Sequence, residues 1–261
     1  MLRRLYSQIY KHGTTLLTWP GEWATILIYP FIGLMSLGLF SSYVTGSGAG
    51  SSAFIFVIYG VMSWNVYSNA MQILTRGFYY ELWDGTLKNL FLARIRIKEF
   101  ILGNMMFAFL TMMSITTMLT IFSILVFGFN IFAAGPLVFL GLTGLILHAF
   151  SDSMLVLSLL IKYGNKYANL AWIIPGLIMV LSGVYYPIAA LPEPVRMISV
   201  MLPSTHAIMG MRNLTLAPEA ALSELLLGIL LGAIYLVISL NVFKYAYKLS
   251  KKDGSLVTLT N

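Results

Sequence analysis

Long apolar runs alternate with short polar stretches along the chain, and this alternation predicts its helices. A helix that crosses a bilayer needs roughly 20 predominantly apolar residues. Six runs reach that length, and polar or glycine- and proline-containing segments separate them. The predicted spans cover residues 23–43, 53–74, 100–129, 136–161, 168–188 and 223–243. We therefore expect an all-α, polytopic membrane protein with six transmembrane helices.

The polar stretches between the runs are too short to form a separate soluble core. We therefore expect residues 1–261 to form a single transmembrane domain. Residues 1–22 carry an apolar stripe at near-helical spacing beside three basic side chains, which predicts a helix lying in the membrane interface. A basic leader without regular structure is the alternative.

Composition supports the membrane interpretation and excludes some chemistry. The chain is 59% hydrophobic and 10% charged, whereas a soluble domain has roughly a quarter of its residues charged. It has no cysteine, which excludes disulfides, thiolate catalysis and thiolate metal sites. A net charge of +7 is compatible with nucleic-acid binding, but the basic residues lie at the predicted membrane edges. That position indicates topology and not nucleic acid.

The basic residues also predict orientation. Fourteen of the 16 lysines and arginines fall in the N-terminal segment, the segment 76–99, the segment after the fourth run and the C-terminal tail. All four segments lie on the same side of a six-span chain. Because loops rich in lysine and arginine stay in the cytoplasm, we expect both termini to be cytoplasmic and the protein to lie in the plasma (inner) membrane.

The segment 76–99 is the most polar stretch between two apolar runs. It reads as two helical pieces broken at Asp84-Gly85, and Leu87, Leu90 and Phe91 form one apolar face of the second piece. Such a helix buries its apolar stripe either in the groove of a partner protein or against lipid head groups. The spacing alone leaves both possibilities open.

The segment 189–222, on the opposite side, is interrupted by prolines. Pro187, Pro192, Pro194 and Pro203 bound apolar runs too short to span. The run 195–202 has eight residues, about 12 Å of helix. Such pieces are tolerated at membrane depth when they pack against protein, so we expect outer re-entrant helices here.

Two ionisable residues lie inside the fourth predicted span. His148 and Asp152 are four residues apart and therefore share a helix face. They form either a proton or ion relay that lines a pathway, or a hydrogen-bonded pair that locks helix packing. In the second case, partners are expected in the second span, among Asn65, Asn69 and Gln72.

Two of these segments resemble the ABC-2-type transporter permeases, the membrane subunits of ATP-driven exporters. The stretch from Glu81 through Gly85-Thr86-Leu87-Lys88-Asn89-Leu90 is similar to the family's E…GTLE.L loop. The stretch Gly183-Val184-Tyr185-Tyr186-Pro187, with Leu191-Pro192 and Leu202-Pro203 followed by Arg212, is similar to its G.fyP…LP…lP…R segment. Gly60 and Trp64 match a looser G…W pattern. The chain departs at Arg94, where the family often has proline, and this concerns where the coupling helix ends.

The resemblance implies roles for particular residues. The coupling helix that docks on a cytoplasmic ATPase would be formed or shaped by Glu81, Gly85, Thr86, Leu87 and Leu90. An outer gate would contain Tyr186, Pro187, Pro192, Pro203 and Arg212.

The resemblance also implies partners. The chain has no Gly-x4-Gly-Lys-Ser/Thr loop for phosphate binding. We therefore expect no ATP hydrolysis and no cofactor in this chain, with ATP and Mg²⁺ held by a separate ABC ATPase subunit. Six spans are half of the family's usual set, which implies that two permease copies pair, as a homodimer. Membrane lipids would surround this dimer.

The function implied is outward transport of an amphiphilic or lipid-linked substrate, such as a drug, lipid, glycolipid or polysaccharide. The alternative is an ATP-independent secondary transporter or channel that uses His148 and Asp152. A membrane enzyme is a third class, but the chain has no His-Glu-x-x-His zinc motif, and no other predicted span carries a Gly-x-Ser nucleophile motif to work with His148.

Overall fold

The computed structural model of the chain describes residues 13–14, 21, 28–44, 50–83 and 97–253. These residues are all-α, as predicted, and form eight α-helices and three short 3-10 helices. The α-helices are α3 (Tyr29–Val44), α4 (Gly50–Trp83), α6 (Ile97–Phe127), α7 (Val138–Tyr163), α8 (Leu170–Leu181), α9 (Glu193–Ser199), α10 (Pro203–Leu216) and α11 (Pro218–Lys252). The 3-10 helices are η3 (Ile131–Ala134), η4 (Gly164–Tyr167) and η5 (Ile188–Ala190).

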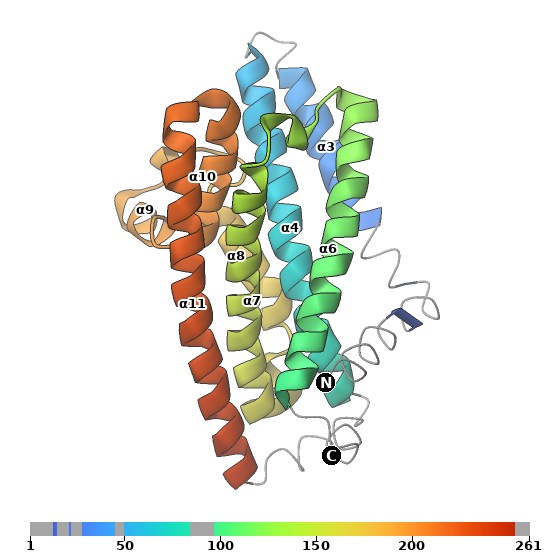
Figure 1. Cartoon of the computed structure of the whole chain (residues 1–261), viewed down its shortest axis with the longest axis vertical. Coiled ribbons are helices and arrows are strands. Elements are labelled where there is room, and N and C mark those ends of the chain that lie inside the picture. The colour runs from blue at the N-terminus through green and yellow to red at the C-terminus, as the bar shows by residue number, and fades with distance from the viewer. Residues whose placement is uncertain (1–12, 15–20, 22–27, 45–49, 84–96, 254–261) are drawn as a thin grey trace.

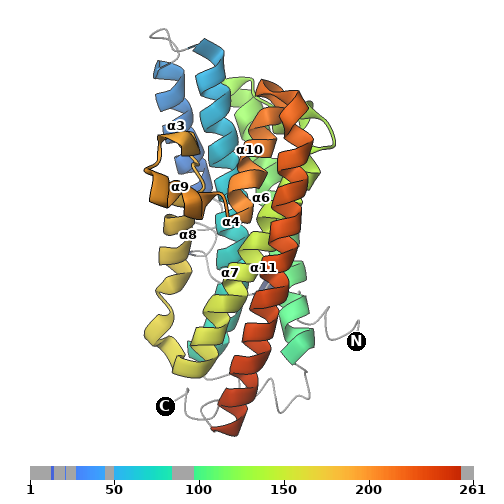
Figure 2. The same ribbon diagram turned by 90° about the vertical axis from the view of Figure 1, so that its left-hand side faces the viewer.

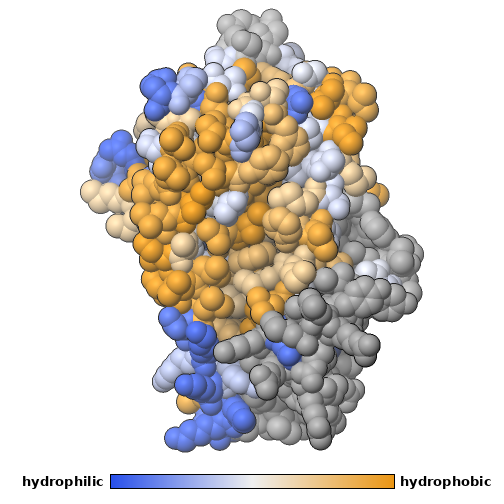
Figure 3. Space-filling view, in the orientation of Figure 1, coloured by the Kyte–Doolittle hydropathy of each residue, from blue (hydrophilic) through white to orange (hydrophobic). Residues whose placement is uncertain are grey.

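The long helices stand side by side, with α7 in the middle of the bundle (Figures 1 and 2). α7 makes its most extensive contacts with α11, α4 and α10. Within its most apolar stretch 83% of the residues are buried in protein, compared with 33% for α6 and 22% for α11. α7 is therefore the core helix, while α6 and α11 turn apolar surface outward (Figure 3).

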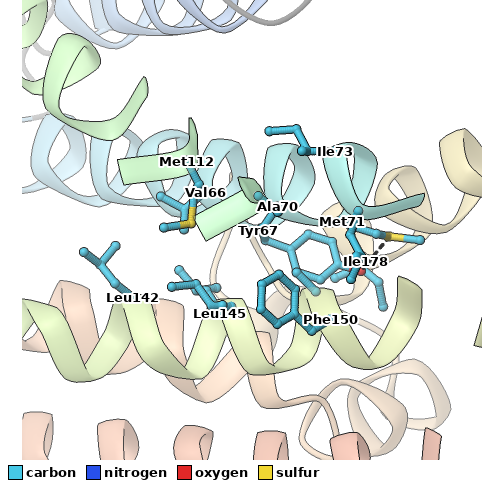
Figure 4. Packing of buried hydrophobic residues seen from close by; sticks show 14 of the residues in the cluster. Val66, Tyr67, Ala70, Met71, Ile73, Met112, Leu142, Leu145, Phe150 and Ile178 are labelled. Atoms are coloured by element: carbon cyan, nitrogen blue, oxygen red, sulfur yellow. Dashed lines mark hydrogen bonds between the residues drawn. The ribbon is translucent and has the colours of Figure 1, made fainter. Parts of the chain in front are cut away.

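Apolar side chains of α4 face α7 in the interior (Figure 4). They recur at the spacing of one helix face, as packing against a neighbouring helix requires. The buried cluster includes Val66, Tyr67, Ala70 and Met71 of α4, and Leu142, Leu145 and Phe150 of α7.

Small residues bring α7, α10 and α11 close together. A Cβ placed on Gly228 of α11 would lie 3.0 Å from the backbone nitrogen of Ala207 in α10. A Cβ on Gly144 of α7 would lie 3.3 Å from the Cβ of the same alanine. Membrane helices pack through such small residues, which let backbones approach.

Three of the described helices are long and apolar enough to cross a membrane, over Glu99–Phe127, Val138–Tyr163 and Pro218–Lys252. The protein is therefore an integral membrane protein, and six spans stay a prediction. α4 has 34 residues, a sufficient length, but asparagines and serines in its second half lower its hydropathy. α3 has 16 residues, Tyr29–Val44, and the first residues of the predicted span, 23–27, lie outside the described residues.

The predicted fifth span, 168–188, is too long. α8 has 12 residues, about 18 Å of helix, whereas the hydrocarbon core is about 30 Å thick. The helix stops because Ser182 caps it and Gly183 follows with a φ of 64°, a left-handed conformation that ends helices. The rest of the predicted span is a turn that leads into η5.

The two ends of the bundle differ. We call the end that holds the exposed Lys248, Lys251 and Lys252 of α11 the basic end (Figure 3). We call the opposite end, where α9 and α10 lie, the capped end (Figures 1 and 2). α9 and α10 have 7 and 14 residues, too few to cross a bilayer, as expected for the segment 189–222.

Candidate functional site

Arg212 of α10 joins the capped end to α4 and to the end of α8. Its Nε donates to the carbonyl oxygen of Phe56 at 2.9 Å, and its Nη1 donates to that of Gly183, also at 2.9 Å. Its Nη2 donates to the carbonyl oxygen of Val184. The guanidinium also lies 3.5 Å from the centre of the Phe56 ring. With the side chain only 3% exposed, Arg212 is a buried cation held by carbonyls and an aromatic face.

Two of these carbonyls are available because α8 ends early. Gly183 and Val184 lie beyond the end of α8, so helical hydrogen bonds do not use their carbonyls. The left-handed Gly183 turns the chain so that both carbonyls face Arg212. Ser182 adds a hydroxyl contact of 2.5 Å to Ser204 of α10. The break in α8 and the arginine therefore form one structure.

The prolines of the predicted outer gate begin the short elements. Pro187 precedes η5, Pro192 precedes α9, and Pro203 is the first residue of α10. Proline suits these positions because the first residues of a helix have no intrahelical acceptor for their N–H groups. Tyr186 donates its hydroxyl to the carbonyl of Val180 at 2.6 Å. These residues shape the cap, and their role as a gate stays a prediction.

A histidine that sequence analysis missed ties the capped end to α11. Nδ1 of His206 lies 2.7 Å from Oε2 of Glu224, and its Nε2 lies 2.8 Å from the carbonyl oxygen of Val200. One side chain of α10 thus connects the end of α9 with the first turns of α11. The 18-residue separation of His206 and Glu224 gives no periodic signal in the sequence.

The structure brings His148 and Asp152 together on α7, as predicted. Nε2 of His148 lies 3.4 Å from Oδ2 of Asp152. Tyr67 of α4 donates its hydroxyl to the same oxygen at 2.5 Å. The His148 ring lies against the rings of Tyr67 and of Tyr235 in α11, with centroid distances of 5.3 and 5.7 Å. The pair is a buried junction of α4, α7 and α11.

The partner of this pair in α4 is not one of the three predicted. Asn65 and Asn69 bond to backbone carbonyls of α4, and Gln72 bonds to Ser68 and Arg76. These side chains lie on a different face of α4 from Tyr67. The prediction of Asn65, Asn69 or Gln72 as partners was therefore wrong.

That other face of α4 lines a cavity of about 260 Å³ between α3, α4 and α8. Its wall contains Tyr29, Pro30, Trp64, Asn65, Ser68, Asn69, Gln72 and Trp172. We call it the amide cavity because three of these side chains are amides. Trp64 donates its indole N–H to the carbonyl of Pro175 at 3.4 Å, which helps to hold α8 against α4.

A second cavity, of about 110 Å³, follows toward the basic end. Thr75, Arg76, Tyr79, Tyr80, Ala168, Asn169, Ala171 and Trp172 line it. Trp172 belongs to both walls, and the Arg76 guanidinium lies 5.3 Å from the centre of its ring. The two cavities therefore follow each other along α4 and meet at Trp172.

The predicted coupling residues are only partly described. Glu81 is buried, two residues before the end of α4, so the first part of the segment 76–99, residues 76–83, continues α4 as a helix. Gly85, Thr86, Leu87 and Leu90 lie outside the described residues. Among the residues that the structure does describe, no group of three or more histidine, aspartate or glutamate side chains is placed to bind a metal ion.

Comparison with known families agrees with this architecture. A family model described as "ABC-2 type transporter" matches residues 4–216, from the N-terminal segment to the end of α10. The match includes the cavities, the His148–Asp152 pair and the capped end. No curated protein matches the chain. Because the family model covers most of the sequence, the chain belongs to the ABC-2 type transporter family, as its membrane-embedded permease domain.

Proposed function

We propose that the chain is the membrane subunit of an ATP-driven exporter and that its substrate enters along the face of α4 that lines the two cavities. The observation that carries this proposal is their arrangement in series, with Trp172 in both walls. Polar side chains inside a membrane helix are expensive unless they line a functional surface. The polar face of α4 is such a surface.

The basic end would be the cytoplasmic side, because 14 of the 16 basic residues fall in segments assigned to that side. Substrate would then move from the basic end past Trp172 into the amide cavity, and leave past α9 and α10. Tyr29 and Trp172, at 67% and 54% exposed, form the rim of that cavity. A second copy of the chain facing this rim would close the path.

ATP would be hydrolysed by a separate ABC ATPase subunit that docks on residues 84–96. The family membership supports this partner. The continuation of α4 to Trp83 also supports it, because a rigid helix of 34 residues would link the docking site to both cavities and to Gly60 near the capped end. The substrate would be amphiphilic or lipid-linked.

A transporter that works through His148 and Asp152 without ATP has less support. Neither residue lines either of the two cavities along α4. Both are enclosed by Tyr67 and Tyr235, an arrangement that suits helix packing better than ion passage.

Co-expression with an ABC ATPase subunit tests the proposal. Leu87→Asp combined with Leu90→Asp should abolish co-purification of the ATPase and substrate-stimulated ATP hydrolysis. Leu87→Met with Leu90→Met, which keeps the stripe apolar, should leave both intact. If the aspartate variant still bound the ATPase and transported normally, the coupling assignment would be wrong.

A further inference from the structure

The two asparagines of the amide cavity have fixed orientations. Nδ2 of Asn65 donates to the carbonyl oxygen of Val61 at 2.9 Å, and Nδ2 of Asn69 donates to that of Asn65 at 2.8 Å. A backbone carbonyl only accepts hydrogen bonds, so each amide must point its nitrogen at the helix. Each amide oxygen is thereby left as the group available to an occupant of the cavity.

These two oxygens are acceptors without a partner among the described residues. Both asparagines are almost fully buried, at 4% and 6% exposed. An amide oxygen at the wall of a cavity can accept a hydrogen bond from an occupant, so an occupant that brings hydrogen-bond donors is favoured. Asn65 and Asn69 are one helical turn apart, about 5–6 Å between their Cβ atoms, so two separated donors on one ligand would satisfy both.

The rest of the wall favours a ring with apolar faces. Trp64 and Trp172 contribute indole rings, and Tyr29 contributes a phenol ring at the rim. An aromatic face packs well against the C–H face of a saturated ring. Ser68 accepts from Gln72 at 3.0 Å, and its own hydroxyl hydrogen can be donated to an occupant.

Charge on the occupant is disfavoured. None of the eight described residues that line the amide cavity is charged, and an uncompensated charge is expensive to bury. The nearest cation along α4 is Arg76, whose Nη2 donates to Oε1 of Gln72 at 2.8 Å. A cationic head group would be repelled by that guanidinium, and the described part of the cavity wall offers an ammonium head no carboxylate.

We propose that the amide cavity binds an uncharged, hydroxyl-rich ring, such as the glycosyl head group of an amphiphile. Two hydroxyls would donate to the amide oxygens of Asn65 and Asn69, and the ring would pack against Trp64 and Trp172. This inference rests on the proposed function, because it names the substrate class of the same path.

The test compares three short amphiphiles that share one chain: hexyl glucoside, hexyltrimethylammonium and hexyl sulfate. The permease–ATPase complex in nanodiscs is titrated with tritiated hexyl glucoside, and the other two compete below their micelle concentrations. Saturable binding of hexyl glucoside that neither charged compound displaces is the expected result. Asn65→Leu with Asn69→Leu should weaken binding by about 10-fold or more, since two hydrogen bonds are lost.

A labelling experiment locates the bound compound. Because the chain has no cysteine, Tyr29→Cys creates a single reactive site at the rim of the cavity. Hexyl glucoside should slow maleimide labelling at position 29 several-fold. It should not slow labelling of the control Tyr43→Cys, at a position 77% exposed on the same helix.

The outcomes separate this proposal from the proposed function. If hexyltrimethylammonium or hexyl sulfate bound more strongly than hexyl glucoside, the proposed substrate class would be wrong. The proposed substrate path along the two cavities would not be affected. Unchanged binding in the Asn65→Leu, Asn69→Leu variant, or saturable binding of none of the three compounds, would also overturn the class. If Trp172→Ala in addition left transport unchanged, the path itself would be wrong.

Discussion

Gly60 of α4 lies so close to Val184 that a Cβ placed on the glycine would stand 1.9 Å from the valine carbonyl oxygen. The same Cβ would lie 2.4 Å from Nη2 of Arg212. No other amino acid fits without displacing the contacts of that arginine.

Gly60→Ala should therefore destabilise the protein. The added methyl group forces Val184 and Arg212 away from α4, and overpacking of this kind costs about 1–3 kcal/mol. The thermal unfolding temperature of the purified complex should fall. Gly176→Ala in α8 is the control, because a Cβ there meets nothing within 4 Å; equal effects of the two substitutions would contradict the prediction.

Arg212→Lys should also lower the unfolding temperature. A lysine side chain has all its N–H donors on one nitrogen atom. It therefore cannot reach the carbonyls of Phe56, Gly183 and Val184 together, and some of these buried acceptors lose their hydrogen-bond donor. We expect a loss of about 3 kcal/mol or more. Arg196→Lys, which changes an exposed arginine paired with Glu193, should cost less than about 0.5 kcal/mol.

Trp172→Ala should reduce transport by roughly 10-fold, equivalent to about 1.4 kcal/mol, while the complex still assembles. The substitution removes the wall that the two cavities share. Transport into proteoliposomes measures the effect. Ile173→Ala is a matched control, because Ile173 is the next residue, is 51% exposed and lines neither cavity. A similar loss in both variants would indicate a general defect of α8.

Asp152→Asn should leave transport and ATP hydrolysis nearly unchanged. The asparagine oxygen can still accept from Tyr67, so the junction of α4, α7 and α11 is kept. Tyr67→Phe should be worse, by about 1–3 kcal/mol of stability, because it leaves a buried carboxylate without its donor. Loss of transport in Asp152→Asn, with assembly and stimulated ATP hydrolysis intact, would instead show that the pair belongs to a relay.

Sequence patterns predicted the helices well where one signal dominates. Apolar runs gave α6 and α7 to within three residues at each end, because burial in lipid or protein requires continuous apolar sequence. Prolines correctly marked where η5, α9 and α10 begin. Helical spacing placed His148 beside Asp152, since a separation of four residues fixes a common face.

These sequence patterns could not predict which residues make contact between helices. Asn65, Asn69 and Tyr67 are close in sequence, and their partners depend on how α4 is rotated about its axis, which packing against α7 decides. The early end of α8 depends on one left-handed glycine inside an otherwise apolar run. The contact between Gly60 and Val184 joins segments more than 120 positions apart, and no local pattern reports it.

The close packing of α7 against α11 has a mechanical consequence. Gly144 and Gly228 hold the pair together toward the capped end, and at the basic end Lys162 contacts Asp253 at 2.5 Å while Ser250 bonds to the carbonyl of Ile161. We therefore expect α7 and α11 to move together as one rigid body. Any alternation between inward-open and outward-open shapes would then fall to α3 and α8, the walls of the amide cavity that lie outside this pair.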